Sequence, residues 1–403
     1  MIHISDALSI DGQIQNLSIA SHSDLSIDAE GLTLFPGLID PHVHFRVPGM
    51  DYKEDWRSAS KAAIYGGYTT VFDMPNTIPP TCTVALLQQK KELIDAQLHE
   101  AGIPLRYQLF LGADKTHLRE IAHAKEFAVG IKVFMGSSTG GLMMDDDESL
   151  QAVFELAAAH QLVVAVHAED EKRLRDRQQQ FKNSRDYSDH SKIRDAETAR
   201  IAVEKAITLA RRTLARLYIT HVSTAEELAL IRQAKREGLS VYAETTPHHL
   251  FLSTKDYAAL QGKAVVNPPL RSPDIAVWEA ITEGVIDTIG SDHAPHTEAE
   301  KAKPYGTCPS GVPGIETTLP LLLTAYHQGM ISLQRIVQLT SSRAQEIFHL
   351  AHTEDAVLVD LNKKMLVMPE RLKTKCAWSP FAGRELQGWP VYTIVQGQCF
   401  PLF

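Results

Sequence analysis

Two histidines, His42 and His44, stand at the end of an apolar run that begins at Leu38. If this run is a β-strand, both imidazoles point to the same side, because successive side chains of a strand alternate between its faces. Two imidazoles on one face can bind a metal ion. The alternative is a pair of surface histidines, because so short a pattern also arises by chance.

Four further polar residues lie within or directly after other apolar runs. They are Lys132, His167, His221 and Asp292. With the histidine pair they make six potential metal ligands, provided that carbon dioxide has carbamylated the lysine and turned its cation into a carboxylate. Six ligands are enough for two zinc ions that share a bridge, since zinc binds imidazole and carboxylate groups.

Two further roles are open to Lys132. It lies in the apolar run 129–135, where a charged ammonium is costly to bury. Its ammonium could form a salt bridge or extend to solvent, or its amine could be a Schiff-base nucleophile with a lowered pKa. The Schiff-base role would leave the histidines without a purpose, so we interpret Lys132 as a carbamylated metal ligand.

Eight apolar runs of strand length position these residues, and helical patterns separate several of them. The runs are residues 38–43, 69–74, 107–111, 129–135, 162–166, 217–220, 241–245 and 286–290. Strands that are apolar throughout are typical of a parallel sheet. Eight strands close a TIM-type (β/α)8 barrel, in which active-site residues sit at the C-terminal ends of the strands. We therefore predict an α/β fold whose barrel mouth brings the six potential ligands together.

Two segments illustrate the predicted helices. After Asp145, apolar residues follow the spacing of a helix that buries one face; they are Leu150, Val153, Phe154, Ala157 and Ala158. Further along the chain, Ser223 and Glu226 form the pattern of a capping box at a helix start. Gly238 is typical of the residue that follows a helix end.

The two ends of the chain carry alternating β-type patterns and no helical stripe. We expect residues 1–34 and 352–403 to pair into one small β-sandwich domain, and residues 35–351 to form the barrel. The alternative is two independent terminal arms.

Composition limits the classes of function. Lysine and arginine number 40 against 49 aspartates and glutamates, a net charge of −9, and no basic patch suggests nucleic-acid or anionic-membrane binding. No apolar run reaches the roughly 18 residues of a membrane span, and the N-terminus has no signal-peptide pattern. The cysteines, too widely spaced for a disulfide framework, are Cys82, Cys308, Cys376 and Cys399. We therefore expect a cytoplasmic protein with a small-molecule substrate.

On these residues the sequence resembles the amidohydrolase superfamily. Its pattern of His-x-His on strand one, lysine on strand four, histidines on strands five and six and aspartate on strand eight is matched throughout. Within it, the sequence resembles the longer dihydroorotases, related to the dihydroorotase domain of multifunctional pyrimidine enzymes. The matching segments are residues 40–46, 73–77, 246–250, 267–271 and 290–297.

The resemblance implies a reaction and a set of roles. The reaction is the reversible cyclisation of N-carbamoyl-L-aspartate to L-dihydroorotate in pyrimidine biosynthesis. Two zinc ions, bridged by N6-carboxylated Lys132, would supply hydroxide as the nucleophile, and Asp292 would be the general acid and base. By the same resemblance Arg46, Asn76 and His296 bind the substrate carboxylate, and Asn267 contacts the ring. A surface ion pair is the alternative for Arg46, and a turn residue for Asn76.

The glycine-rich segment 136–141 follows Lys132 and fits a lid over the substrate, since glycines supply hinges. We expect Thr139 within it to reach the substrate, with a plain loop as the alternative. His248 and His249 are expected to support the site rather than to bind metal.

Other functions stay open. The first alternative is another cyclic amidase, an allantoinase, hydantoinase or dihydropyrimidinase, whose rings lack the carboxylate that Arg46 and His296 would bind. The second is a non-catalytic scaffold, such as a partner of aspartate transcarbamoylase, but such relatives lose metal ligands and this chain keeps six. A homodimer is a family expectation.

Overall fold

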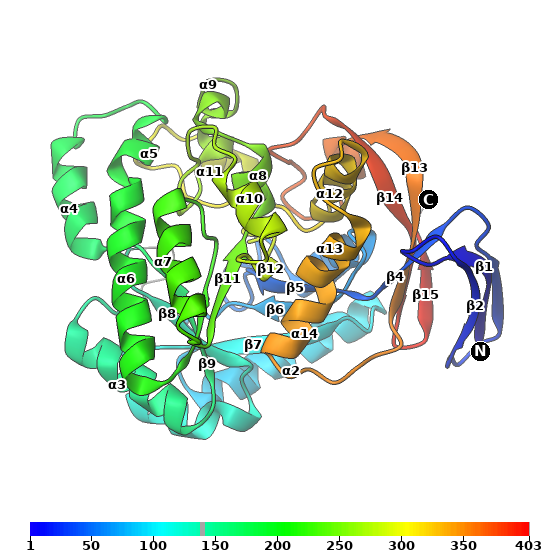
Figure 1. The fold of residues 1–403 in the computed structure, drawn as a ribbon, viewed down its shortest axis with the longest axis horizontal. Coiled ribbons are helices and arrows are strands. Elements are labelled where there is room, and N and C mark those ends of the chain that lie inside the picture. The colour runs from blue at the N-terminus through cyan, green and yellow to red at the C-terminus, as the bar shows by residue number, and fades with distance from the viewer. Residues whose placement is uncertain (138–141, 403) are drawn as a thin grey trace.

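The computed structural model describes residues 1–137 and 142–402. Its larger sheet holds eight parallel strands in sequence order, with helices around them (Figure 1). The strands are β5 (Leu38–Val43), β6 (Tyr68–Asp73), β7 (Arg106–Gly112), β8 (Gly130–Phe134), β9 (Val163–His167), β10 (Arg216–Ile219), β11 (Val241–Thr245) and β12 (Thr288–Ile289). Each predicted apolar run overlaps one of these strands, so the predicted (β/α)8 barrel is confirmed.

The barrel closes at the residues predicted to bind metal. Val43, the last residue of β5, forms a parallel bridge with His293, which follows β12. The backbone N–H of His44 donates to the carbonyl of His293 at 2.8 Å. The first and last strands therefore meet beside His44 and Asp292.

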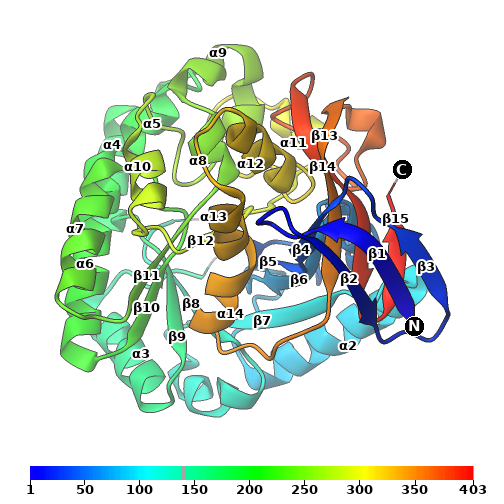
Figure 2. The same cartoon turned by 45° about the vertical axis from the view of Figure 1, so that its right-hand side comes forward.

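Helices cover the outside of the barrel (Figure 2). The α-helices are α1 (Trp56–Tyr65), α2 (Val84–Ala101), α3 (Asp147–Ala159), α4 (Glu171–Gln180), α5 (Asp189–Ile193), α6 (Ala196–Thr213), α7 (Ala225–Arg236), α8 (Pro247–Phe251), α9 (Tyr257–Leu260), α10 (Ala276–Thr282), α11 (Glu298–Lys301), α12 (Thr318–His327), α13 (Leu333–Val337) and α14 (Arg343–Ile347). Among the described residues, no helix is long and apolar enough to cross a membrane.

The sequence patterns explain why individual helices form. In α3 the predicted stripe is buried at Leu150, Val153, Phe154 and Ala157, and Ala158 lies at its half-buried edge. The capping box of α7 was placed one residue too early: Thr224 is the N-cap, and Glu227 returns the bond to its backbone N–H. Ser223 and Glu226 fit the same motif by type, so only the backbone path decides between the two registers. Gly238 follows this helix with a φ of 78°, as its residue type predicts.

A second sheet is built from both ends of the chain. Its strands are β1 (Ile2–Leu8), β2 (Ile14–Ile19), β3 (Leu25–Asp28), β4 (Thr33–Pro36), β13 (Ala356–Leu366), β14 (Glu385–Val395) and β15 (Gln398–Pro401). The antiparallel pairing of β4 with β13 joins the two ends, and both termini lie on this side of the molecule (Figure 2). The alternative of two independent arms is wrong.

Gly37 is the single residue between β4 of the terminal sheet and β5 of the barrel. A Cβ atom there would lie 2.3 Å from Thr69 Oγ1 and 2.8 Å from the Cβ of Asp355, so only glycine fits. The division into a barrel of residues 35–351 and a small domain of residues 1–34 and 352–403 stays a prediction, since strand pairing does not show which parts fold independently.

Candidate metal centre and substrate cavity

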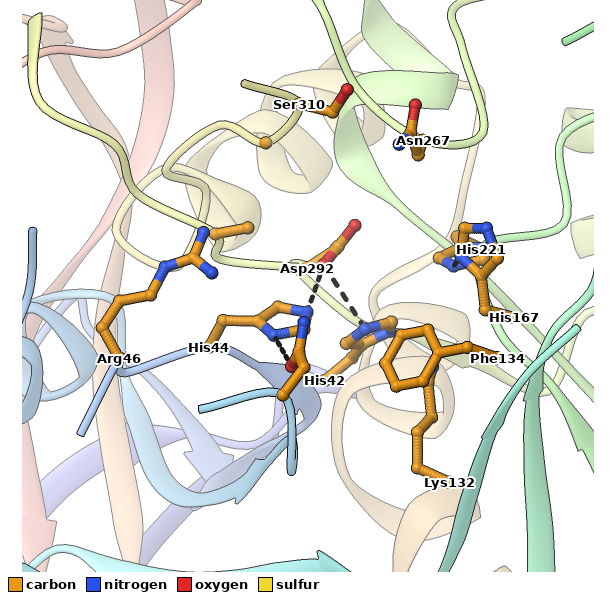
Figure 3. A pocket seen from close by; sticks show the side chains of 13 residues that line it. His42, His44, Arg46, Lys132, Phe134, His167, His221, Asn267, Asp292 and Ser310 are labelled. Atoms are coloured by element: carbon orange, nitrogen blue, oxygen red, sulfur yellow. Dashed lines mark hydrogen bonds and ion pairs between the residues drawn. The ribbon is translucent and has the colours of Figure 1, made fainter. Parts of the chain in front are cut away.

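A cavity opens at the C-terminal ends of the barrel strands (Figure 3). Its lining contains all six predicted metal ligands together with Arg46, Asn76, Phe134, Asn267, Ala294, Ser310 and Gly311. These residues come from segments as far apart in sequence as 42 and 311, and the barrel alone brings them to one place.

One side of the cavity holds a compact group of three potential ligands. One Asp292 carboxylate oxygen lies 3.3 Å from His42 Nε2 and 3.1 Å from His44 Nε2. The ligand atoms of these three residues all lie within 4.8 Å of one another. Imidazole and carboxylate groups at this spacing form a candidate metal site.

The other side of the cavity holds His167, His221 and Lys132. Nδ1 of His167 and Nε2 of His221 face each other at 2.9 Å, and both rings are buried. Lys132 is 1% exposed, and its ammonium donates to Thr220 Oγ1 at 3.2 Å. Among the described residues no carboxylate lies within 4.0 Å of Lys132, so a salt bridge does not explain its burial.

Buried oxygen atoms orient three of the histidines. His42 directs Nδ1 to Glu244 at 2.7 Å, His44 directs Nδ1 to the amide oxygen of Asn76 at 2.8 Å, and His167 directs Nε2 to Glu169 at 2.8 Å. In a neutral, metal-bound ring the nitrogen that bonds this oxygen would carry the proton, which leaves the other nitrogen as the metal ligand.

Glu244 and Glu169 were missed by the sequence analysis. Tyr218 and Arg194 hold them in turn: the Tyr218 hydroxyl donates to Glu244 at 2.8 Å, and the Arg194 guanidinium donates to Glu169. A signal was present, because Glu244 is a charged residue in the apolar strand β11, as Lys132 is in β8.

The protonation states suit metal binding, which needs neutral imidazoles and ionised carboxylates. Burial lowers the pKa of His44 to about 3 and lowers the pKa of His167 and of His221. Burial alone would raise the pKa of Asp292, but the adjacent His42 and His44 hold it well below its usual range. Burial also lowers the pKa of Lys132 to about 8, which favours the neutral amine that reacts with carbon dioxide.

Three residues of the cavity have left-handed backbones. Their φ values are 69° at Arg46, 42° at His221 and 45° at Asp292. For side chains other than glycine this conformation is unfavourable and must be held by the surrounding fold. At each of these positions the chain leaves a barrel strand, and the turn directs the side chain into the mouth.

Arg46 is 2% exposed and lies beside the metal-ligand group (Figure 3). Its Nε donates to the carbonyl of Pro295 at 3.1 Å, and Nη2 lies 3.2 Å from His296 Nε2. Within residues 1–137 and 142–402, no carboxylate oxygen is within 4.0 Å of this guanidinium. Arg46 is therefore a buried cation that no described carboxylate contacts directly, which excludes a surface ion pair, and a ligand anion could bind its guanidinium.

His296 lies behind Arg46 and is not among the residues that line the cavity. Its Nε2 faces the carbonyl of Ser310 at 2.9 Å, and its Nδ1 faces the ammonium of Lys53 at 3.0 Å. The ring is therefore neutral, with its proton on Nε2. In this state His296 donates a hydrogen bond to the carbonyl of Ser310, and the positive charges here are those of Arg46 and Lys53.

The cavity's own backbone is also supported from outside. The ammonium of Lys301 donates to the carbonyls of Val265, Pro309 and Gly311 at 2.8–3.1 Å. The indole of Trp378, in the segment between β13 and β14, donates to the carbonyl of His296 at 2.8 Å. Residues from the C-terminal part of the chain thus brace the substrate side of the barrel mouth.

Comparison with known proteins decides the family. Residues 33–399 match the model of the amidohydrolase family. The chain belongs to this family. A dihydroorotase of Methanosarcina acetivorans is 36% identical over 402 residues, which cover 94% of this chain and 84% of the relative. A dihydroorotase of Bacillus subtilis is 33% identical, covering 94% of this chain and 89% of the relative.

A solved structure is similar over almost the whole amidohydrolase chain. It is an L-hydantoinase (dihydropyrimidinase) from Arthrobacter aurescens, with a TM-score of 0.90 and 29% identity, covering 99% of this chain and 95% of that chain. The family and the relatives confirm the predicted class: this amidohydrolase is a cyclic amide hydrolase that acts on a small molecule. The residues of the cavity indicate which cyclic amide it hydrolyses.

The remaining predicted residues of this amidohydrolase take different positions. Asn76 and Asn267 both line the cavity, whereas Thr139 lies outside the described residues. His249 is bonded to Thr246 and to the carbonyl of Pro268, a supporting position next to Asn267. His248 is buried, and neither ring nitrogen has a hydrogen-bond partner among the described residues.

A second group of potential ligands lies away from this cavity. Cys82 Sγ is 3.7 Å from His117 Nδ1, which is 2.8 Å from Asp114. Asp114 also accepts from the backbone and hydroxyl of Thr116. Hydrogen bonds within the turn therefore already satisfy Asp114 and His117 without a ligand.

Proposed function

We propose that this amidohydrolase is a zinc-dependent dihydroorotase, which interconverts N-carbamoyl-L-aspartate and L-dihydroorotate in pyrimidine synthesis. The observation that carries the proposal is Arg46. It is a buried guanidinium in the cavity wall, and no carboxylate oxygen of the described residues lies within 4.0 Å of it. Dihydroorotate is a cyclic amide that carries a carboxylate, and a planar guanidinium suits that group.

Two zinc ions fit the donor set. His42, His44 and Asp292 would hold one, and His167 and His221 the other, with N6-carboxylated Lys132 shared between them. Zinc supplies a nucleophile from water at neutral pH and polarises the ring carbonyl. Carboxylation of Lys132 would replace a buried ammonium, which has no carboxylate of the described residues within 4.0 Å, by an anion that metal cations can neutralise. The facing ring nitrogens of His167 and His221, 2.9 Å apart, support the second position.

Asp292 is the proposed general acid and base. Its pKa is held well below its usual range by His42 and His44, so it is ionised at neutral pH. It can accept a proton from the attacking water and then deliver that proton to the leaving ring nitrogen. Its carboxylate lines the cavity, so the substrate can reach it.

Arg46 would bind the substrate carboxylate, with Asn76 beside it in the cavity wall. His296 lies one contact further away, so it would act on the carboxylate through Arg46 or after a small ring movement. Asn267 would contact the ring from the opposite wall. Thr139 stays a predicted contact.

A hydantoinase or dihydropyrimidinase is the second candidate, because the solved Arthrobacter aurescens relative carries those names. Their rings lack the carboxylate, so in such an enzyme the buried Arg46 guanidinium would have no described carboxylate in direct contact. A non-catalytic scaffold would have no reason to keep six potential ligands around one cavity.

A substrate panel tests the proposal. The protein is purified with zinc, its metal content is measured, and turnover is followed on dihydroorotate, hydantoin, dihydrouracil and allantoin. We expect turnover of dihydroorotate in both directions, with a kcat/KM at least about a hundredfold above the other rings. A zinc-loaded protein that hydrolyses hydantoin but not dihydroorotate would establish the second candidate instead. His44→Ala serves as the inactive control.

A further inference from the structure

The segment between α4 and α6 carries a residue that reaches the substrate side of the cavity. Within it, the short helix α5 places His190 against the backbone of Val266 and the side chain of Asn267. The imidazole is 7% exposed, so no bulk water substitutes for these partners.

The partners of His190 determine where its proton lies. Nε2 faces two acceptors, the carbonyl of Val266 at 3.0 Å and the amide oxygen of Asn267 at 2.9 Å. Nδ1 lies 3.2 Å from the hydroxyl of Tyr305, which can donate to it. A lone pair on Nε2 would repel both oxygens, so Nε2 carries the proton and Nδ1 accepts. Burial lowers the pKa of His190 to about 4, in keeping with this neutral ring.

The tautomer of His190 in turn orients Asn267. The amide oxygen accepts from His190 Nε2, so the amide nitrogen must point away from His190. Asn267 lines the cavity, and its side chain lies on the wall opposite Lys132 (Figure 3). Among the described residues, no hydrogen bond of Asn267 Nδ2 to the protein is present.

We propose that His190 is a positioning residue that fixes the Asn267 amide with its NH2 group towards the substrate. The site then offers a hydrogen-bond donor at this wall and selects rings that present an acceptor there, such as a ring carbonyl oxygen. This inference rests on the proposed cyclic amide substrate, although it does not depend on which ring is used. If Asn267 were free to turn over, its oxygen could equally face a ring N–H.

A double-mutant cycle tests the proposal. The variants are His190→Met, Asn267→Ala and the two together, and His190→Gln is the conservative variant because its amide keeps one N–H donor near the position of Nε2. The cycle is measured on whichever ring of the panel the wild-type enzyme hydrolyses fastest. Failure of dihydroorotate turnover would then contradict the proposed function alone.

We expect His190→Met to raise KM about five- to tenfold with a smaller change in kcat, the effect of one lost hydrogen bond. The double variant should match Asn267→Ala, because His190 acts only through Asn267. His190→Gln should restore at least half of the lost affinity. Zinc content should stay at the wild-type level, since no described contact joins His190 to the predicted metal ligands.

Asn267→Asp keeps the test decisive if His190→Met does not fold. An aspartate presents only oxygens, so it should raise KM more than Asn267→Ala does. Additive effects of His190→Met and Asn267→Ala would overturn the proposal, and so would an Asn267→Asp variant with a KM close to that of the wild-type enzyme. A KM close to the wild-type value in Asn267→Asp would mean that the side chain at position 267 accepts a hydrogen bond from the substrate and does not donate one.

Discussion

The two walls of the cavity are supported by groups of opposite character. On the metal side, the Glu244 and Glu169 carboxylates hold His42 and His167 at 2.7–2.8 Å. On the substrate side, neutral groups hold Arg46 and Asn267: the carbonyl of Pro295 and the imidazole of His190. Carboxylates therefore contact the ligands of the first wall directly, whereas no described carboxylate contacts Arg46 or Asn267 on the second.

This difference shows what each wall is built to receive. Carboxylates behind imidazoles increase their basicity and favour a bound cation. A guanidinium that contacts only carbonyl and imidazole groups keeps its charge for an anion from outside. The same cavity can therefore bind metal cations and an anionic substrate a short distance apart.

The largest effect should come from Asp292, which is both a proposed metal ligand and the proposed general acid and base for the substrate. Asp292→Asn is expected to lower kcat by about 10³-fold, because an amide cannot shuttle the proton. Turnover is measured together with zinc content, and Asp274→Asn, at an exposed position, is the control. A fully metallated variant with a kcat within tenfold of the wild-type value would assign the proton transfer to another group.

Arg46→Met tests the substrate wall alone. The KM for dihydroorotate should rise about 30- to 100-fold, since a charge-assisted contact to the carboxylate is lost. Zinc content and the slow turnover of any uncharged ring should stay unchanged. Exposed Arg212→Met is the matched control. Equal losses on dihydroorotate and hydantoin would show that Arg46 supports the fold of the wall and does not read a carboxylate.

Glu244→Gln tests the metal wall alone. Zinc affinity should weaken about tenfold or more, because a ligand-supporting carboxylate near His42 is replaced by a neutral amide. The KM measured at saturating zinc should stay within about twofold of the wild-type value. The exposed Glu279→Gln variant controls for a change in net charge. An unchanged zinc affinity would contradict the claim that the Glu244 carboxylate strengthens metal binding through His42.

The smallest effect concerns pH. Burial lowers the pKa of Lys132 to about 8, so its neutral, CO₂-reactive form decreases about tenfold for each pH unit below that value. Carboxylation of the metal-free protein should therefore become faster from pH 6 to pH 8 and then level off. The ¹³C signal of the carbamate measures it at each pH under the same partial pressure of labelled CO₂, so that dissolved CO₂ stays constant, with Lys132→Met as the blank. A rate independent of pH would exclude the free amine as the reacting group.

The barrel was predictable because each strand is a local pattern. Eight apolar runs predicted the strands β5–β12. A polar residue at the C-terminal end of such a run indicates a position at the barrel mouth, because the strand ends there. The capping box of α7 was misplaced by one residue because Ser223 and Thr224 are equally good caps by type. Propensity alone does not resolve such a choice, since it depends on where the backbone turns.

By itself, the sequence determined the barrel and the six potential ligands, because residue type and strand spacing carry that information along a few neighbouring positions. Only the tertiary structure decided which groups support them. Glu244, Arg194 and His190 act on residues that lie 202, 25 and 77 positions away in the sequence. Their partners, and with them the direction of each hydrogen bond, depend on how distant loops meet around the barrel mouth. The charge behind each wall, and therefore the kind of ligand that each wall favours, is for this reason a property of the folded chain.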